Sequence, residues 1–298
     1  PAWMWAVFIS LVLGLLALDL GVLNRNSREI GVRQSLLLSA FYMTIGVAFG
    51  GWIWYQSGEQ SALEYLTGFV VEKSLAMDNI FIIAMIFSYF AIPRKYQHRV
   101  LVWGILGVIV LRGIMIAGGA ALVENFHWVL YLFAAFLILT GIRMLFAPGH
   151  GGNLDDNAVL KFLRRRLPVT KALHGDRFVV READPDTGAT KTFITPLFLA
   201  LIMVELADLV FAVDSIPAIF AITTDPFIVY TSNIFAILGL RALYFALAAL
   251  IHRFAYLKYA LAAVLVFVGS KIFVADMLGL AKIPPAVSLG VTLAILAA

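Results

Sequence analysis

The chain of 298 residues contains no cysteine, and only 13% of its residues are charged. Without thiols it can form no disulfide, no thiolate metal site and no thiol nucleophile. Hydrophobic residues make up 62% of the sequence and the mean hydropathy is +0.95, which is far more apolar surface than a soluble core of this size can bury. The sequence therefore predicts an integral membrane protein.

The sequence also offers little for catalysis or for nucleic-acid binding. It has no nucleophile with an adjacent base and no nucleotide-binding loop, and its five histidines lie in loops or at the ends of apolar runs. The net charge of +4 requires no nucleic-acid partner, because basic residues of membrane proteins gather in cytoplasmic loops. We therefore expect a protein that is not an enzyme and that is surrounded by the lipid bilayer.

Apolar runs of roughly 20 residues recur along the chain, and this is the length a helix needs to cross about 30 Å of hydrocarbon. They predict an all-α polytopic membrane protein. The first run lacks the basic start and the cleavage site of a signal peptide, so we expect it to be retained. Nine spans are expected, at about 3–23, 34–56, 62–91, 98–121, 125–147, 196–221, 226–251, 256–279 and 283–298.

The basic residues predict the orientation. They are concentrated after the first, third, fifth and seventh spans, whereas the alternate connections carry mainly acids. By the positive-inside rule, the basic connections lie in the cytoplasm. This predicts an N-terminus outside the cell and a C-terminus in the cytoplasm.

One polar segment, at 148–195, is too charged to span the membrane. Its residues 157–167 predict a basic amphipathic helix at the inner interface, and 177–181 and 190–194 flank a turn signal and predict a β-hairpin. The predicted units are two helices at 1–61, a three-helix unit at 62–147, this cytoplasmic loop at 148–195, a second three-helix unit at 196–279, and a last helix, cut short by the end of the sequence, at 280–298.

The two three-helix units resemble each other. When Asp78 is aligned with Asp214, Glu72 falls opposite Asp208 and Asn79 opposite Ser215. Leu111-Arg112 likewise resembles Leu240-Arg241, and the third spans share the pattern of 133–143 and 261–271. Because each unit has three spans, the second must enter the membrane from the opposite side. This predicts inverted repeats, as in many secondary transporters.

The acidic stretches predict one ion site where the first helices of the two units meet. Charged side chains at membrane depth are costly and usually face a polar interior. The available donors are hard oxygens, which favour Mn²⁺, Ca²⁺ or Mg²⁺ over copper or zinc. The expected metal ligands are Asp78, Asp214, Asn79, Ser215, Glu72 and Asp208.

The spacing leaves two arrangements open. On a regular helix Asp78 lies about 120° from Glu72, and Asp214 lies about 120° from Asp208. Either each helix is broken locally, which Pro217 favours in the second copy, or the two acids of each helix face different neighbours.

Further charged residues in the spans have less defined roles. Glu205 and Asp19 are candidates for a proton or ion relay, although Asp19 could equally pair with Arg25. The candidate counter-charges are Lys73, Arg112, Arg241 and Lys271, and a gating role is open for the two arginines. The simpler interpretation of all these residues is that they form buried structural ion pairs.

Three stretches carry a resemblance to a known family: EKSLAMDNI at 72–80, VELADLVFAVDSIPA at 204–218 and TSNIFAILGLR at 231–241. They resemble the signatures of the TerC family, and the layout is similar to that of its Alx branch. The resemblance implies a bacterial inner-membrane protein of the LysE-type exporter group, linked to manganese export, tellurite resistance and alkaline stress. It also implies roles for the acidic motif residues named above.

We therefore expect a transporter that exports Mn²⁺ by alternating access, with the divalent ion and the lipid bilayer as its partners. Proton coupling is open, because carboxylates that release an ion could take up protons. Two alternatives also stay open. One is export of Ca²⁺, which accepts the same donors; the other is a non-transporting assembly or stress factor that recruits partners through the polar loop. The sequence does not predict an oligomeric state.

Overall fold

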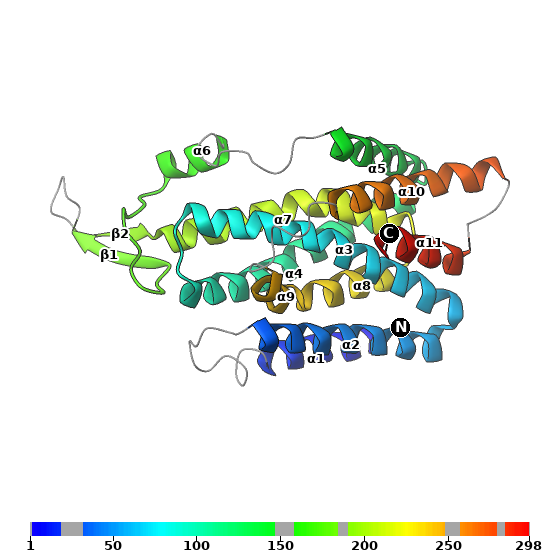
Figure 1. The fold of residues 1–298 in the computed structure, drawn as a ribbon, viewed down its shortest axis with the longest axis horizontal. Helices are drawn as coiled ribbons and strands as arrows, with labels where there is room; N and C mark the ends of the chain where they lie inside the picture. Colours follow the sequence, from blue (N-terminus) through cyan, green and yellow to red (C-terminus); the bar gives the residue numbers. More distant parts are fainter. Residues whose placement is uncertain are drawn as a thin grey trace.

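The computed structural model describes residues 2–18, 32–146, 158–183, 190–247, 257–278 and 284–297, which form a bundle of long helices with a small hairpin at one end (Figure 1). The elements are, in order, α1 Ala2–Leu18, α2 Val32–Ser57, α3 Glu59–Tyr89, α4 Arg94–Asn125, α5 Val129–Phe146, α6 Ala158–Arg166, β1 Val179–Ala183, β2 Thr190–Ile194, α7 Pro196–Phe220, α8 Pro226–Leu238, α9 Leu240–Leu247, α10 Leu257–Met277 and α11 Pro285–Ala297.

Five described helices, α2, α4, α5, α7 and α10, are long and apolar enough to cross a membrane, and α1, α8 and α11 are apolar but shorter. Large apolar side chains such as Leu37, Val110, Ile114 and Leu139 are exposed on the outside of the bundle. A soluble protein rarely exposes so much apolar surface. The chain is thus a polytopic membrane protein, as predicted, and the number of nine crossings stays a prediction.

A helix occupies each of the nine ranges predicted as spans, but the helix breaks differ from expectation. The range at 226–251 contains a break, because α8 ends at Leu238 and α9 begins at Leu240. In contrast, α7 continues through Pro217, so a break at Asp214 is wrong. Pro217 lies in the last turn of α7 among buried residues, where packing holds the helix although one hydrogen bond is missing.

Residues at the helix termini determine where α2 ends and where α8 begins. Gly58, with φ of +90°, separates α2 from α3 in a conformation that favours glycine. At the start of α8 the Oδ1 atom of Asp225 accepts a hydrogen bond from the N–H of Phe227 at 2.8 Å, and Pro226 occupies the first helical position. This combination is a typical helix start.

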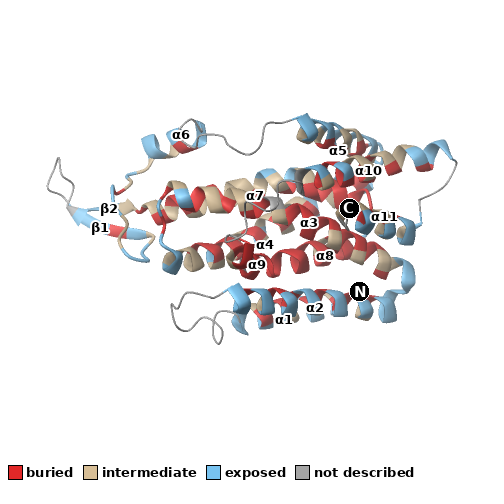
Figure 2. Cartoon of the chain, viewed as in Figure 1, coloured by how far each residue is buried: buried red, intermediate tan, exposed pale blue. Residues whose placement is uncertain are grey.

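The buried residues gather where α3, α7 and α8 meet (Figure 2). Helix α8 is buried along most of its length, whereas α1, α2 and α5 expose their outer sides. Aromatic rings pack α1 and α2 onto α8, with Phe8 5.7 Å and Phe49 4.6 Å from the ring of Phe235. A polar group on the inner faces of α3, α7 or α8 is therefore held away from lipid.

Helices α5 and α10 cross at two glycines. A Cβ atom at Gly141 would lie 2.9 Å from the carbonyl oxygen of Ala262, and one at Gly269 would lie 2.7 Å from that of Ala134. Small residues let helix backbones approach closely in membranes. The two contacts are reciprocal, and the residues they join are those that align between the two three-helix units.

The hairpin lies beyond one end of the helices, at the left of Figure 1. Its strands pair antiparallel, with Val179 opposite Ile194. The hydroxyl of Thr195 donates to the carbonyl of Phe178 at 3.2 Å, and the Arg99 guanidinium of α4 lies 5.0 Å from the Phe178 ring. The hairpin is thus fixed to α4 and α7, and we call this end of the bundle, with α6, the hairpin end.

Candidate functional site

A buried arginine lies at the centre of the helices. The side chain of Arg112 on α4 is 2% exposed. Its Nε donates to Oδ2 of Asp208 at 3.0 Å and its Nη2 donates to Oδ1 of Asp208 at 2.8 Å. Its Nη1 donates to the carboxylate of Glu72. One guanidinium therefore compensates two carboxylates, through the planar, two-point geometry that arginine provides.

Three neutral side chains complete the hydrogen bonding. Asn233 of α8 accepts from Nη1 of Arg112 at 2.9 Å and donates to Glu72 at 3.2 Å. Asn79 donates to Oδ1 of Asp208 at 3.0 Å, and Ser215 accepts from Arg112 at 3.4 Å. We call the following six residues, each at most 3% exposed, the polar network: Glu72, Asn79, Arg112, Asp208, Ser215 and Asn233.

The helical period explains how distant segments contribute to this network. Glu72 and Asn79 lie seven residues apart on α3, and Asp208 and Ser215 lie seven apart on α7. Seven residues make almost two turns, so each pair shares one helix face. The structure brings both helix faces to Arg112. This arginine lies between Glu72 and Asp208, the position expected of a counter-charge.

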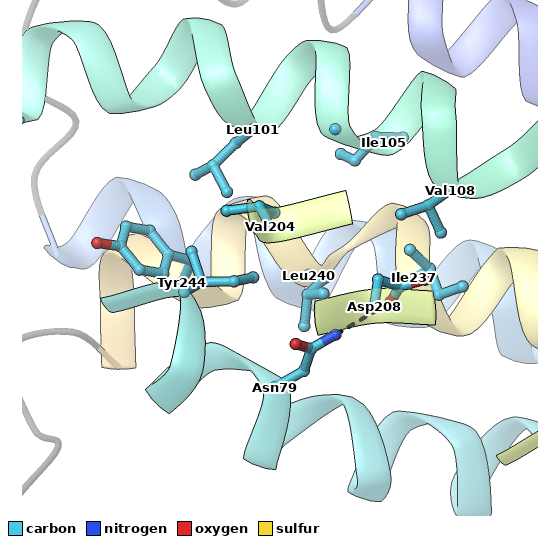
Figure 3. Close-up of a pocket in the computed structure, with 11 residues that line it drawn as sticks. Asn79, Leu101, Ile105, Val108, Val204, Asp208, Ile237, Leu240 and Tyr244 are labelled. Atoms are coloured by element: carbon cyan, nitrogen blue, oxygen red, sulfur yellow. Dashed lines mark hydrogen bonds between the residues drawn. The ribbon is translucent and has the colours of Figure 1, made fainter. Parts of the chain in front are cut away.

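A cavity of about 30 Å³ adjoins the polar network (Figure 3). Asn79 and Asp208 line it together with mainly apolar residues of α3, α4, α7, α8 and α9, namely Ile83, Leu101, Gly104, Ile105, Val108, Val204, Ile237, Leu240 and Tyr244. The Oδ1 atom of Asn79 is buried and accepts no hydrogen bond from the described groups. The cavity has room for roughly two water molecules beside this oxygen.

The structure places Asp214 outside the polar network, so it does not bring the six predicted ligands together. Asp214 interacts instead with Thr140 and Arg143 of α5. Its neighbour Ser215 faces Arg112, and successive helical residues point about 100° apart. Of the two arrangements that the spacing left open, α7 adopts the second: the two acids face different neighbours.

No three His, Cys, Asp or Glu side chains within the described ranges lie close enough to hold a metal ion by themselves. A cation bound beside Asp208 would therefore need neutral oxygen donors and water as its further ligands. Asp19 lies outside the described residues, and so do the side chains of Asp78 and Arg241.

The two lysines predicted as counter-charges each contact a neutral oxygen atom. Lys73 donates to the backbone oxygen of Ala236 at 3.0 Å. In an unbroken helix the N–H of Leu240 would bind that oxygen, four residues on. Lys73 thus caps the end of α8 at the break. Lys271 lies 3.4 Å from the hydroxyl of Ser288 on α11.

Glu205 lies beside the polar network, one helical turn before Asp208. Both its carboxylate oxygens are buried and accept no hydrogen bond from the part of the chain that the structure describes. A Cβ atom at Gly107 would overlap the carboxylate of Glu205, and one at Gly104 would lie 3.7 Å from its Oε1 atom. The two glycines of α4 therefore make room for this carboxylate.

Sequence reasoning did not assign a site role to Asn233. The signal was present, because Thr231, Ser232 and Asn233 form a polar triplet inside an apolar run. Polar residues at membrane depth are candidates for function even when they carry no charge.

Apolar helices that enclose a charged network define a polytopic membrane protein with a buried polar centre, an arrangement that often marks an ion or substrate pathway. Comparison with family models agrees with this class: the model of the integral membrane protein TerC family matches residues 57–298. The chain belongs to the TerC family, as the resemblance of its motifs predicted.

Its relatives cover nearly the whole chain. It is 48% identical to an uncharacterized membrane protein of Rickettsia bellii over 292 residues, which are 98% of this chain and 94% of the relative. It is 45% identical to the "putative membrane-bound redox modulator Alx" of Escherichia coli K12 over 302 residues, which are 98% of this chain and 91% of that protein. No solved structure matches the chain.

Proposed function

We propose that this protein is a transporter that exports divalent metal ions, Mn²⁺ first among them, through the cavity beside the polar network. The observation that carries the proposal is the Oδ1 atom of Asn79, which accepts no hydrogen bond from the described residues and lines the cavity together with Asp208. A buried acceptor without a partner is costly. A cation or its water shell in the cavity would satisfy it.

The donors around the cavity favour a hard cation. Asp208 and Asn79 supply carboxylate and amide oxygen, and water would complete the shell, as suits Mn²⁺ or Ca²⁺. This assigns the first ligands to Asp208 and Asn79 and not to Asp214. Glu72 and Ser215 act through Arg112, whose positive charge weakens cation binding. Weak binding is needed if the ion is to leave again.

The transport mechanism is alternating access between two inverted units, α3 to α5 and α7 to α10. The reciprocal contacts of Gly141 and Gly269 support this repeat, because a two-fold axis in the membrane plane would relate them. In the bacterial inner membrane the hairpin end faces the cytoplasm, since arginine and lysine are concentrated there. Export then runs away from the hairpin end.

The test is Mn²⁺ flux in proteoliposomes. Asp208→Asn and Asn79→Ala should each reduce the flux at least about tenfold at low Mn²⁺ concentration, the factor that corresponds to roughly 1.4 kcal/mol of lost binding. Asp225→Asn is the matched control, because it removes an acid at the start of α8, away from the cavity, and keeps a good helix cap. The same assay with Ca²⁺ ranks the two ions.

Parental flux in a folded Asp208→Asn variant would contradict this site. If the parent protein itself carries no Mn²⁺ or Ca²⁺, the non-transporting alternative replaces the proposal. The proposal also includes coupling of metal export to proton uptake, in which Glu205, beside Asp208, carries the proton. A flux that does not respond to an imposed pH gradient, in the parent and in Glu205→Gln alike, would exclude it.

A further inference from the structure

The cavity extends from the polar network toward the hairpin end. In Figure 3, Tyr244 lies at the opposite end of the lining residues from Val108 and Ile237. Along α4 the lining begins at Leu101, in the second turn, and ends at Val108, one turn before Arg112. The cavity thus connects the buried network to the first turns of α4, where the hairpin is attached.

A hydrogen bond lies at this end of the cavity. The hydroxyl of Tyr244 on α9, a side chain that is 3% exposed, donates to Oε1 of Gln97 on α4 at 3.1 Å. The Nε2 atom of Gln97 donates to the backbone oxygen of Ile92 at 2.9 Å, which fixes the amide. The ring of Tyr244 packs edge to face against Phe87 of α3 at 5.6 Å. Three segments therefore meet at one tyrosine.

The helix that carries Tyr244 is separated from the rest of its span. Gly239 stands between α8 and α9, and a Cβ atom there would lie 3.0 Å from Nζ of Lys73 and 3.1 Å from Cβ of Tyr42. Lys73 supplies the hydrogen bond that the carbonyl of Ala236 lacks at the break. The break is therefore already stabilised, so a movement of α9 would leave the helical hydrogen bonds within α8 intact. Interrupted helices in membranes usually adjoin a cavity or a binding site.

We propose that α9 is a gate helix, which closes the cavity toward the hairpin end through the Tyr244–Gln97 hydrogen bond and opens it by moving about Gly239. Lys73 and Glu72 are successive residues of α3, so the hinge and the polar network share one rigid element. A displacement of Glu72 in the polar network would therefore also displace Lys73 at the hinge. The proposal rests on the proposed function only for the identity of the ion that passes; the gate itself concerns access of water and solutes.

The absence of cysteine from this chain allows a direct test with single cysteine substitutions. Leu101→Cys places a single thiol in the cavity, at a side chain that is 5% exposed. A charged, membrane-impermeant methanethiosulfonate reagent is applied to one side of the membrane at a time, in the absence of metal. Thr192→Cys, on an exposed position of β2, identifies the side that carries the hairpin.

Loss of the Tyr244 hydroxyl should favour the open gate. We expect Tyr244→Phe to raise the labelling rate of Leu101→Cys by a factor on the order of three to ten, and only from the hairpin side, because one hydrogen bond between membrane helices gives a change of about this size. Gln97→Leu removes the other partner and should have the same effect. This second variant keeps the test valid if either protein folds poorly.

The matched control is Tyr230→Phe. The hydroxyl of Tyr230 also connects this span to α4, since it donates to the carbonyl of Ile109 at 3.2 Å, but Tyr230 does not line the cavity. An unchanged rate with Tyr244→Phe and Gln97→Leu overturns the gate. Equal acceleration by Tyr230→Phe, or labelling only from the opposite side, overturns it as well. These results are separate from Mn²⁺ flux, so the gate can fail while the transport proposal stands.

Discussion

Arg112 binds Asp208 through two nitrogen atoms, with Nε–Oδ2 at 3.0 Å and Nη2–Oδ1 at 2.8 Å, in the interior of a membrane protein. The same guanidinium binds Glu72. Such a group is stable only when its remaining hydrogen bonds are also made, and Asn233 and Ser215 make them. With both carboxylates ionised, the three charges sum to one negative charge beside the cavity.

Replacement of Arg112 should destabilise the protein strongly. Arg112→Leu leaves Glu72 and Asp208 as buried carboxylates without a counter-charge, which typically costs about 3–5 kcal/mol. Thermal unfolding of the purified protein in detergent should show a markedly lower midpoint. Adding Glu72→Gln and Asp208→Asn to Arg112→Leu should restore much of the loss, because the uncompensated charges are then absent. A single variant that unfolds like the parent would contradict the network.

Gly107→Ala tests the placement of Glu205. The new Cβ atom would overlap the carboxylate of Glu205. The flexible end of this side chain must therefore shift, at a cost near the lower end of the range of about 1–3 kcal/mol that is typical of overpacking. Glu205→Ala should suppress this cost in the double variant, since the obstructing group is removed. Gly118→Ala on the same helix is the control, because a Cβ atom there meets nothing within 4 Å. Equal unfolding midpoints for Gly107→Ala and Gly118→Ala would show that Glu205 lies elsewhere.

The α5–α10 crossing predicts two matching losses of stability. At Gly141 and at Gly269 an added Cβ atom approaches a backbone carbonyl oxygen, at 2.9 Å and 2.7 Å, and a backbone cannot yield as a side chain can. Each alanine substitution should therefore cost about 1–3 kcal/mol, by similar amounts if the contacts are related by symmetry. Gly290→Ala, with nothing within 4 Å of its Cβ position, should not lower the unfolding midpoint. A loss at only one of the two glycines would argue against the symmetric crossing.

Much of the fold could be predicted because it follows from short-range patterns. The lengths of the apolar runs predicted nine spans, because a helix needs about 20 apolar residues to cross the membrane core. The structure has a helix in each of these nine ranges. The seven-residue spacing of Glu72 from Asn79, and of Asp208 from Ser215, put each pair on one helix face. Both faces do meet in the polar network.

The failures concern partners on other helices. Pro217 suggested a break in α7, but buried neighbours hold that helix together, whereas Gly239 gives no comparable signal and stands at a break that Lys73 stabilises. Asp214 and Asp208 were both predicted as ligands of one ion, yet Asp214 faces α5 and Asp208 faces Arg112. Which helix packs against a given face is not encoded in the spacing of that helix.

The sequence by itself determined that this is a helical membrane protein whose acids occur in matched pairs, because hydropathy and helical period are properties of the chain alone. Only the tertiary structure decided that Arg112 joins Glu72 to Asp208, that Asn233 completes the network, and that a cavity beside Asn79 ends at Tyr244. These relationships join α3, α4, α7, α8 and α9, and contacts between helices arise from three-dimensional packing that no single segment specifies.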